Sequence, residues 1–261
     1  MKLITLNTWG GQANLNDLIA FFASHNDTDI FCLQEVFHNA SQLVKLSASG
    51  RALQNIEPNL LTIITTTLPE YQVLFNPQFR DVYGLVTLVH KKHTIISQGE
   101  VYVYKQKGFE SKKDIGNHAR HLQHVTIKYK KGTLTTLNLH ALWNGKGKTD
   151  SKDRILQSKN IIDFTTTLKN PFILAGDFNL RPDTKSIKLL EDGGLKNLIT
   201  QYNITDTRTS LYTKSERFAD YVFISKDINV KKFKVLPDTV SDHAPLQLSF
   251  DITNIDKTSK V

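Results

Sequence analysis

Apolar and polar residues alternate along the chain in short runs, and the spacing within each run predicts a strand or a helix. Short apolar runs that end at a polar residue are typical of buried strands. They predict strands at residues 3–7, 29–36, 71–75, 85–91, 94–104, 124–129, 133–142, 171–178, 219–225, 229–236 and 245–250. Helical spacing with capping signals predicts a helix from about residue 15 to 22, two helices within 39–68, and helices over 151–168 and 186–194.

The number of strands bears on the fold class. About ten strands are many for one open sheet, and helices lie between them in sequence. Two packed sheets with helices outside therefore fit the α/β pattern better than one doubly wound sheet. We find no linker and no low-complexity segment, so residues 1–250 are expected to form a single domain, followed by a polar tail over 251–261.

Composition adds a preference for an anionic partner. The 261 residues are 39% hydrophobic and 22% charged, as in soluble globular proteins, and the net charge is +8. A basic chain suits nucleic acid or another phosphorylated molecule, but the same charge can simply maintain solubility. The one cysteine, Cys32, allows no disulfide within the chain. We see no signal peptide or transmembrane span, and we expect a cytoplasmic monomer.

Several predicted strands carry a polar or ionisable residue at one end. These residues are Asn7, Glu35, His140, Asp177, Asn179, Asp220, Asp242 and His243. Burying such a group alone is expensive, so we expect them to converge at one rim and share hydrogen bonds. Asp177 and Asn179 are two residues apart, so they would share a face if the chain there is extended.

These side chains have the chemistry of a metal-assisted phosphoester hydrolase. Asn7, Glu35 and Asp242 are hard oxygen donors that suit Mg²⁺ or Mn²⁺, and the sequence lacks the paired Cys/His spacing of a zinc site. His140 and His243 can donate hydrogen bonds to a phosphate oxygen. Asp220 can orient His243, while Asp177 can orient or deprotonate a water that Asn179 helps to hold; together these are the parts of such an enzyme.

Taken in order, the motifs resemble those of the endonuclease/exonuclease/phosphatase superfamily. The motifs are LNTW, LQEV, LNLH, GDFN, FADYVF and SDHAPL, and they span residues 3–250. The resemblance implies a four-layer α/β sandwich, with two mixed sheets packed face to face and helices on both outer faces. It also implies a phosphoric ester hydrolase that depends on a divalent cation.

The resemblance further implies a role for each motif residue. Glu35 would be the main metal ligand, with Asn7 and Asp242 beside it. Asp177 would align the attacking water with help from Asn179, and His243, oriented by Asp220, would stabilise the charge that develops on the phosphate. His140 would contact the phosphate or the leaving group, and Arg154 in the following helix is expected to face the phosphate.

Two basic loops are expected to border the rim of the site. Lys146 and Lys148 follow His140 and are expected to bind substrate phosphates, and Trp143 between them and His140 is a candidate for base stacking. The lysines of residues 105–113 could track a phosphate backbone or form a solvated face. His38, His90, His118, His121 and His124 are interpreted as structural, and Trp9 as a packing residue.

We therefore expect a Mg²⁺-dependent phosphodiesterase, with nucleic acid as the favoured substrate. The first alternative is a phosphatase or phosphodiesterase that acts on a small phosphorylated metabolite or a phospholipid. A non-catalytic nucleic-acid-binding module is less well supported, because the residues that chemistry requires are all present.

Overall fold

Two six-stranded sheets form the centre of the molecule. The computed structural model describes residues 1–41, 55–111 and 116–252. Sheet A contains, in spatial order, β11 (Ile228–Val235), β12 (Leu246–Ile252), β1 (Lys2–Asn7), β2 (Ile30–Phe37), β4 (Tyr83–His90) and β3 (Tyr71–Phe79). Sheet B contains β5 (Ile95–Tyr104), β6 (Arg120–Tyr129), β7 (Gly132–His140), β8 (Phe172–Asp177), β10 (Asp220–Ile224) and β9 (Lys196–Asn197).

Each sheet has one parallel pair of strands near its middle. β1 runs parallel to β2 in sheet A, and β7 runs parallel to β8 in sheet B, while the other pairings are antiparallel. Parallel neighbours place their carboxyl ends at the same edge of a sheet. The polar residues at or near the carboxyl ends of these four strands are therefore brought to one end of the sandwich.

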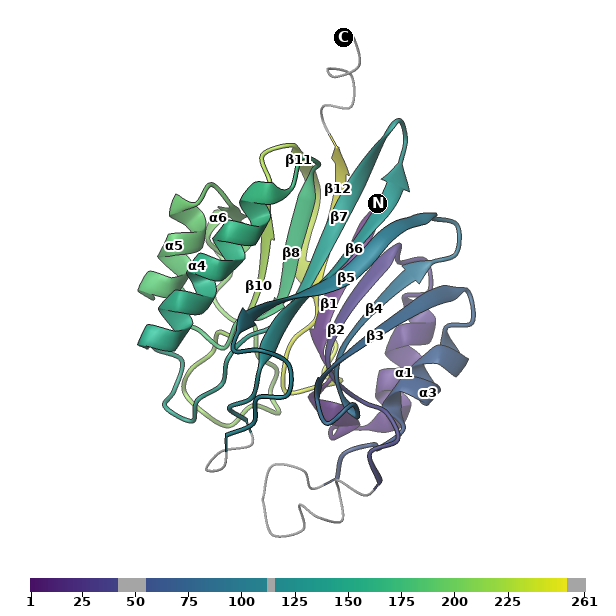
Figure 1. Ribbon diagram of the computed structural model, residues 1–261. Helices are drawn as coiled ribbons and strands as arrows, with labels where there is room; N and C mark the ends of the chain where they lie inside the picture. The colour runs from purple at the N-terminus through teal and green to yellow at the C-terminus, as the bar shows by residue number, and fades with distance from the viewer. Residues whose placement is uncertain (42–54, 112–115, 253–261) are drawn as a thin grey trace.

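Helices cover the outer faces of both sheets (Figure 1). They are α1 (Leu15–Ser24) and α3 (Leu60–Thr67) beside sheet A, and α4 (Lys152–Thr167), α5 (Lys185–Asp192) and α6 (Leu198–Gln201) beside sheet B. As predicted, α1 begins after Asn14, whose side chain accepts hydrogen bonds from two backbone amides of the first turn. The two mixed sheets with outer helices confirm the predicted four-layer sandwich.

Apolar side chains fill the space between the sheets and the space between sheet A and helices α1 and α3, and amide and hydroxyl side chains are also buried near the site. Cys32 is fully buried between the sheets. Gln34 of β2 donates to Asn138 of β7 at 2.7 Å, and Thr87 of β4 donates to Gln123 of β6 at 2.7 Å. Because these buried hydrogen bonds join opposite sheets, they hold one sheet in a fixed position against the other beneath the polar rim.

A few boundaries differ from those expected. β12 continues through Ile252, so the segment expected to be a tail from residue 251 begins with two strand residues. β9 is a two-residue strand that the sequence pattern did not indicate. The first of the two helices expected within 39–68 falls mainly on residues 42–54, which lie outside the described part of the chain.

Candidate active site

Asp177 lies at the centre of the polar rim, at the end of β8. The strand register places Asp220 of β10 beside it on one side and His140 of β7 beside it on the other. Gly176 permits this close pairing: its φ is 141°, and a Cβ there would lie 2.0 Å from the carbonyl oxygen of Leu139. Three strand ends of sheet B therefore deliver three functional side chains to one point.

Sheet A contributes Asn7 and Glu35 to the same point. The pairing of β2 with β4 shifts register between Leu33 and Val36, and Glu35 within this irregularity has a φ of 57°. A bulge of this kind changes the direction of a side chain, and here it sets Glu35 beside Asn7. The Asn7 amide nitrogen donates to Glu35 Oε1 and to Asp177 Oδ2, each at 3.0 Å.

Asn7 therefore positions the two carboxylates, because its amide nitrogen donates a hydrogen bond to each of them. Its Oδ1 accepts a hydrogen bond from the backbone amide of Trp9 at 2.9 Å, which fixes the orientation of the carboxamide. The metal-ligand role expected for Asn7 stays a prediction, because the Oδ1 atom that accepts the Trp9 N–H keeps a second lone pair.

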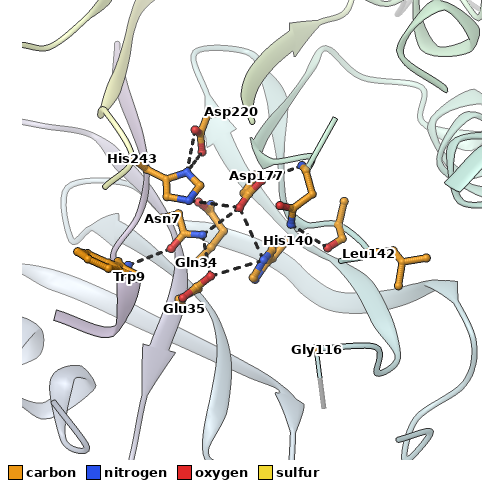
Figure 2. A network of polar contacts seen from close by, with 12 residues as sticks. Asn7, Trp9, Gln34, Glu35, Gly116, His140, Leu142, Asp177, Asp220 and His243 are labelled. Atoms are coloured by element: carbon orange, nitrogen blue, oxygen red, sulfur yellow. Dashed lines mark hydrogen bonds and ion pairs between the residues drawn. The ribbon is translucent and has the colours of Figure 1, made fainter. Parts of the chain in front are cut away.

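His243 and Asp220 form a buried pair against Asp177 (Figure 2). His243 Nδ1 lies 2.9 and 2.8 Å from the two carboxylate oxygens of Asp220, and its Nε2 lies 3.7 Å from Asp177 Oδ2. The backbone amide of His243 donates to the Ser241 hydroxyl at 3.1 Å, which shapes the segment before β12. Asp220 thus orients the imidazole so that Nε2 points to the centre of the site.

His140 faces Asp177 from β7, on the side of β8 away from Asp220. Its hydrogen-bond partners differ from those of His243. Its Nε2 lies 3.7 Å from Asp177 Oδ2 and 3.8 Å from Glu35 Oε1. Its Nδ1 lies 3.1 Å from the hydroxyl of Tyr83, and the buried guanidinium of Arg120 lies beside the His140 carbonyl oxygen at 3.5 Å. Sequence reasoning missed both Tyr83 and Arg120, since neither stands in a motif.

These surroundings give the two histidines opposite charge preferences. Burial and Arg120 lower the pKa of His140 to about 3. Burial and Arg208 also oppose protonation of His243, but Asp220, Asp242 and Asp177 outweigh them and raise its pKa. Burial raises the pKa of Asp177, but His243 and His140 outweigh it, so the carboxyl titrates well below its usual range.

Asp242 is paired with an arginine that the sequence analysis did not single out. Arg208 Nη1 donates to Asp242 Oδ2 at 2.9 Å, and Arg208 also forms a backbone bridge with His243. Asp242 Oδ1 is buried and has no hydrogen-bond partner. In the sequence, Arg208 is only a basic residue that precedes Asp220, and its position alone does not predict a contact with Asp242.

The residues predicted to bind substrate are only partly brought to the site. Trp143 and Lys148 line the cavity beside Asp177, whereas Lys146 is exposed and does not line it. Lys148 Nζ donates to the Phe218 carbonyl at 2.8 Å, and burial lowers the pKa of this amine to about 8. Asn179, whose φ of 53° takes it out of the strand, also lines the cavity.

Arg154 does not face the cavity, contrary to expectation. Its side chain is buried, and it donates to the carbonyl oxygens of Leu142 and Gly147 at 3.3 and 2.8 Å. The reason is that the loop after β7 folds back over the start of α4, and its carbonyl groups need donors. Arg154 therefore holds the loop that carries Trp143 and Lys148.

The cavity at the rim has a volume of about 400 Å³. Of the predicted residues, the lining contains Glu35, His140, Trp143, Lys148, Asp177, Asn179, Asp242 and His243. It also contains several residues that sequence reasoning missed or interpreted as structural: Trp9, Gln12, Phe37, Ile56, Phe79, Tyr83, His118, Arg120, Arg208, Tyr212 and Lys214. His118, interpreted as structural, is thus a cavity residue. His121 is buried elsewhere, 3.8 Å from Glu100.

The donor set of the rim fits a divalent cation. Ligand atoms of Glu35, His140 and Asp177 lie within 4.8 Å of one another, and those of Asp177, Asp220 and His243 form a second such group. Burial and the charges of Asp242 and Asp177 raise the pKa of Glu35, a cost that a bound cation would offset. Asp242 Oδ1 accepts no hydrogen bond and lies 3.7 Å from His243 Nε2, so a further carboxylate oxygen is close to these groups.

Comparison with known proteins agrees with this geometry. Residues 4–243 match the sequence profile of the Endonuclease/Exonuclease/phosphatase family. The chain belongs to that family. Members of the Endonuclease/Exonuclease/phosphatase family are phosphoric ester hydrolases, so the protein is an enzyme of this class. No curated protein sequence matches the chain.

Several solved structures share this fold. A mannosyl-6-phosphatase from Bacteroides thetaiotaomicron is 20% identical with a TM-score of 0.73, covering 97% of this chain and 100% of that one. The human Nocturnin catalytic domain is 17% identical with a TM-score of 0.65, covering 97% and 93%. A humanized D. rerio TDP2 is 15% identical with a TM-score of 0.66, covering 96% and 98%. At these identities the likeness shows the fold alone.

In the part of the chain that the structure describes, no helix is both long and apolar enough to cross a membrane.

Proposed function

We propose that the protein is a Mg²⁺-dependent phosphodiesterase and that nucleic acid is its preferred substrate. The main support is the arrangement around Asp177, which places one ionised carboxylate between two oriented imidazoles and beside Glu35. An ionised carboxylate can orient a water, and imidazole N–H groups can donate to a phosphate. Phosphoryl transfer needs positioning and charge stabilisation more than covalent help, and this site offers both.

Each residue has a distinct part in this proposal. Asp177 accepts a hydrogen bond from the attacking water and aligns it with the phosphorus, and Asn179 helps to hold that water. His243, kept protonated by Asp220, donates from Nε2 to a phosphate oxygen as negative charge grows. His140 stays neutral and donates from Nε2, because its Nδ1 is occupied by the Tyr83 hydroxyl.

Glu35 and Asp242 would hold the Mg²⁺ ion, and Asp177 lies close enough to contribute. Their carboxylate oxygens are the donors that Mg²⁺ prefers. When bound, the ion neutralises charge on the phosphate oxygens. Asn7 would then act by fixing the two carboxylates Glu35 and Asp177 at their present separation.

The cavity lining favours nucleic acid within the phosphodiesters. Lys148, Arg208 and Lys214 place three cations in the cavity wall, and the rings of Trp143 and Tyr212 lie between them. Lys214 Nζ lies 5.9 Å from the Trp143 ring, and the Arg208 guanidinium lies 4.2 Å from the Tyr212 ring. Cations interleaved with aromatic rings suit a strand of phosphates and bases.

A small phosphorylated compound is the second candidate substrate. The cavity of about 400 Å³ is within the range of small-ligand pockets, and the structurally similar mannosyl-6-phosphatase shows that this fold also serves phosphate monoesters.

A hydrolysis screen with Mg²⁺ and with EDTA tests the proposal. Single-stranded RNA, plasmid DNA, a generic bis-aryl phosphodiester and a sugar phosphate would be compared for wild type, Asp177→Asn and Asp183→Asn. Asp183 is a matched control because it is an exposed carboxylate that pairs only with Arg181 among the described contacts. We expect Mg²⁺-dependent cleavage of a polynucleotide that falls about 10²-fold or more in Asp177→Asn and is retained in Asp183→Asn.

Turnover of the sugar phosphate but not of any diester would replace the main proposal with the second. No metal-dependent turnover of any substrate would contradict both.

A further inference from the structure

One part of the cavity wall is a group of four apolar side chains on the side of sheet A. Phe37 is in β2, Phe79 is in β3, Trp9 follows β1, and Ile56 precedes α3. We call these four residues the apolar slot. Phe37, Ile56 and Phe79 pack together and are largely buried, so each presents only an edge to the cavity. The cations Lys148, Arg208 and Lys214 line the cavity from loops of sheet B, after β7 and before β10.

The apolar slot is continuous with the catalytic centre through Tyr83. The Tyr83 ring lies 4.9 Å from the Phe37 ring, and its hydroxyl lies 3.1 Å from His140 Nδ1. Phe37 and Ile56 also pack against Gly10, where an added Cβ would lie 2.9 Å and 3.0 Å from them. One layer of side chains thus separates the slot from the imidazole that faces the reacting phosphate.

Trp9 enters the slot from a strained backbone. Its φ is 50°, and Gly10 and Gly11 follow with φ values of 60° and 75°. A bulky residue in this left-handed region is strained and is retained where the surroundings require it. The Trp9 amide is bonded to Asn7, the residue that also fixes Glu35 and Asp177. The backbone of Trp9 is therefore linked through the Asn7 side chain to Glu35 and Asp177.

We propose that the apolar slot is a subsite for an apolar or aromatic group, about the size of one ring, that is esterified to the reacting phosphate. This inference rests on the proposed function of the site and specifies its substrate class. Such a group would be buried against four apolar side chains while the phosphate reaches His140 and His243. A simple aryl or alkyl ester meets this description directly, and the nucleobase of a terminal nucleotide would reach the slot through the sugar that is esterified to the phosphate.

Non-hydrolysable phosphonates test the subsite without requiring turnover. Calorimetry in Mg²⁺ would compare benzylphosphonate with methylphosphonate at a pH where both are dianions. The extra ring buries apolar area, so we expect benzylphosphonate to bind roughly 10- to 50-fold more tightly to wild type. A second pair, adenosine 5′-monophosphate against ribose 5-phosphate as inhibitors of turnover, asks whether a nucleobase uses the same subsite.

Two variants and one control locate the preference in the slot. Trp9→Asn removes the ring but keeps a residue that adopts positive φ readily, so the turn is expected to persist. Phe79→Ser replaces a second apolar side chain of the slot with a polar one. Leu211→Ser is the control, because Leu211 is 39% exposed and does not line the cavity. We expect the benzyl-to-methyl preference to fall at least five-fold in both slot variants and to persist in the control.

The outcomes separate the subsite from the proposed function. A nucleobase preference that Trp9→Asn also reduces would identify a nucleotide as the occupant, and a preference confined to benzylphosphonate would identify a smaller ester. Equal binding of the two phosphonates, or a preference unchanged in both slot variants, would overturn the subsite alone. Failure of both phosphonates to bind, while a phosphodiester is still cleaved in the hydrolysis screen, would likewise overturn the subsite alone, whereas absence of metal-dependent turnover in that screen would overturn the proposed function.

Discussion

The two sides of Asp177 each present a histidine, and the two imidazoles have opposite properties. His140 and His243 both place Nε2 at 3.7 Å from Asp177 Oδ2. On one side Asp220 holds Nδ1, and carboxylates raise the pKa of His243; on the other Tyr83 holds Nδ1, and burial with Arg120 lowers the pKa of His140 to about 3. Equal distance to one carboxylate therefore does not set the charge of an imidazole.

The difference teaches that burial and the charged groups around each imidazole, and not its distance to Asp177, decide what Nε2 can do. A carboxylate on Nδ1 stabilises the cation, so His243 can stabilise charge in the transition state. A phenol on Nδ1 supplies only a hydrogen bond, so His140 is a neutral donor. One side is suited to charge stabilisation and the other to orientation.

Replacing His243 should cause the largest loss of activity among the variants considered. His243→Gln keeps a hydrogen-bonding group but cannot carry positive charge. We expect kcat to fall by about 10²- to 10³-fold, measured with the best substrate from the hydrolysis screen at saturating Mg²⁺. His140→Gln, which loses no charge, should cost at least five-fold less, and equal losses would remove the distinction between the two sides.

Replacing Asp220 should shift the pH profile as well as the rate. The active form of His243 is protonated, so activity is lost as pH rises through its pKa. Asp220→Asn removes a carboxylate that raises this pKa, and the alkaline limb of kcat/KM should therefore move to lower pH, with kcat reduced roughly 10- to 100-fold. An unshifted alkaline limb would show that His243 is not the group that titrates there.

The two histidines should also affect stability in opposite directions. His140 has a folded-state pKa of about 3 against an ordinary 6.5, so the unfolded chain alone binds its proton as pH falls through that window. Stability is therefore lost on acidification, by about 2 kcal/mol between pH 6.5 and 5. His140→Asn should remove this loss in urea titrations done in EDTA.

The raised pKa of His243 has the reverse sign: its contribution is present below the ordinary pKa and is lost as pH rises through the folded-state value. His243→Asn should therefore lose more stability relative to wild type at pH 6 than at pH 9. A matching pH dependence in both variants would contradict the opposite assignments.

Removing the Tyr83 hydroxyl should have the smallest effect. Tyr83→Phe leaves His140 Nδ1 without its partner but changes no charge. We expect kcat to fall about three- to ten-fold, with about 1 kcal/mol lost in stability and an unchanged alkaline limb in the pH profile. A loss as large as that of His243→Gln would mean that Tyr83 itself contacts the reacting phosphate.

The local pattern of the chain was enough to predict the class of fold. Apolar runs marked most of the strands, and the capping signal at Asn14 marked the start of α1. β9 was missed because a two-residue strand has no periodicity to detect. The face-to-face packing of two mixed sheets came from a family resemblance, since strand pairing depends on contacts between distant segments.

The sequence also identified the strand-end residues, because burying a polar group at the end of an apolar run is costly unless that group has partners. The tertiary structure alone decided their partners and thus their roles. It turned the Asn7 carboxamide towards Glu35 and Asp177, placed Arg208 on Asp242, and used Arg154 to hold a loop. The physical reason is that periodicity reports burial along one segment, whereas pKa and hydrogen-bond direction depend on charges and donors brought from other strands.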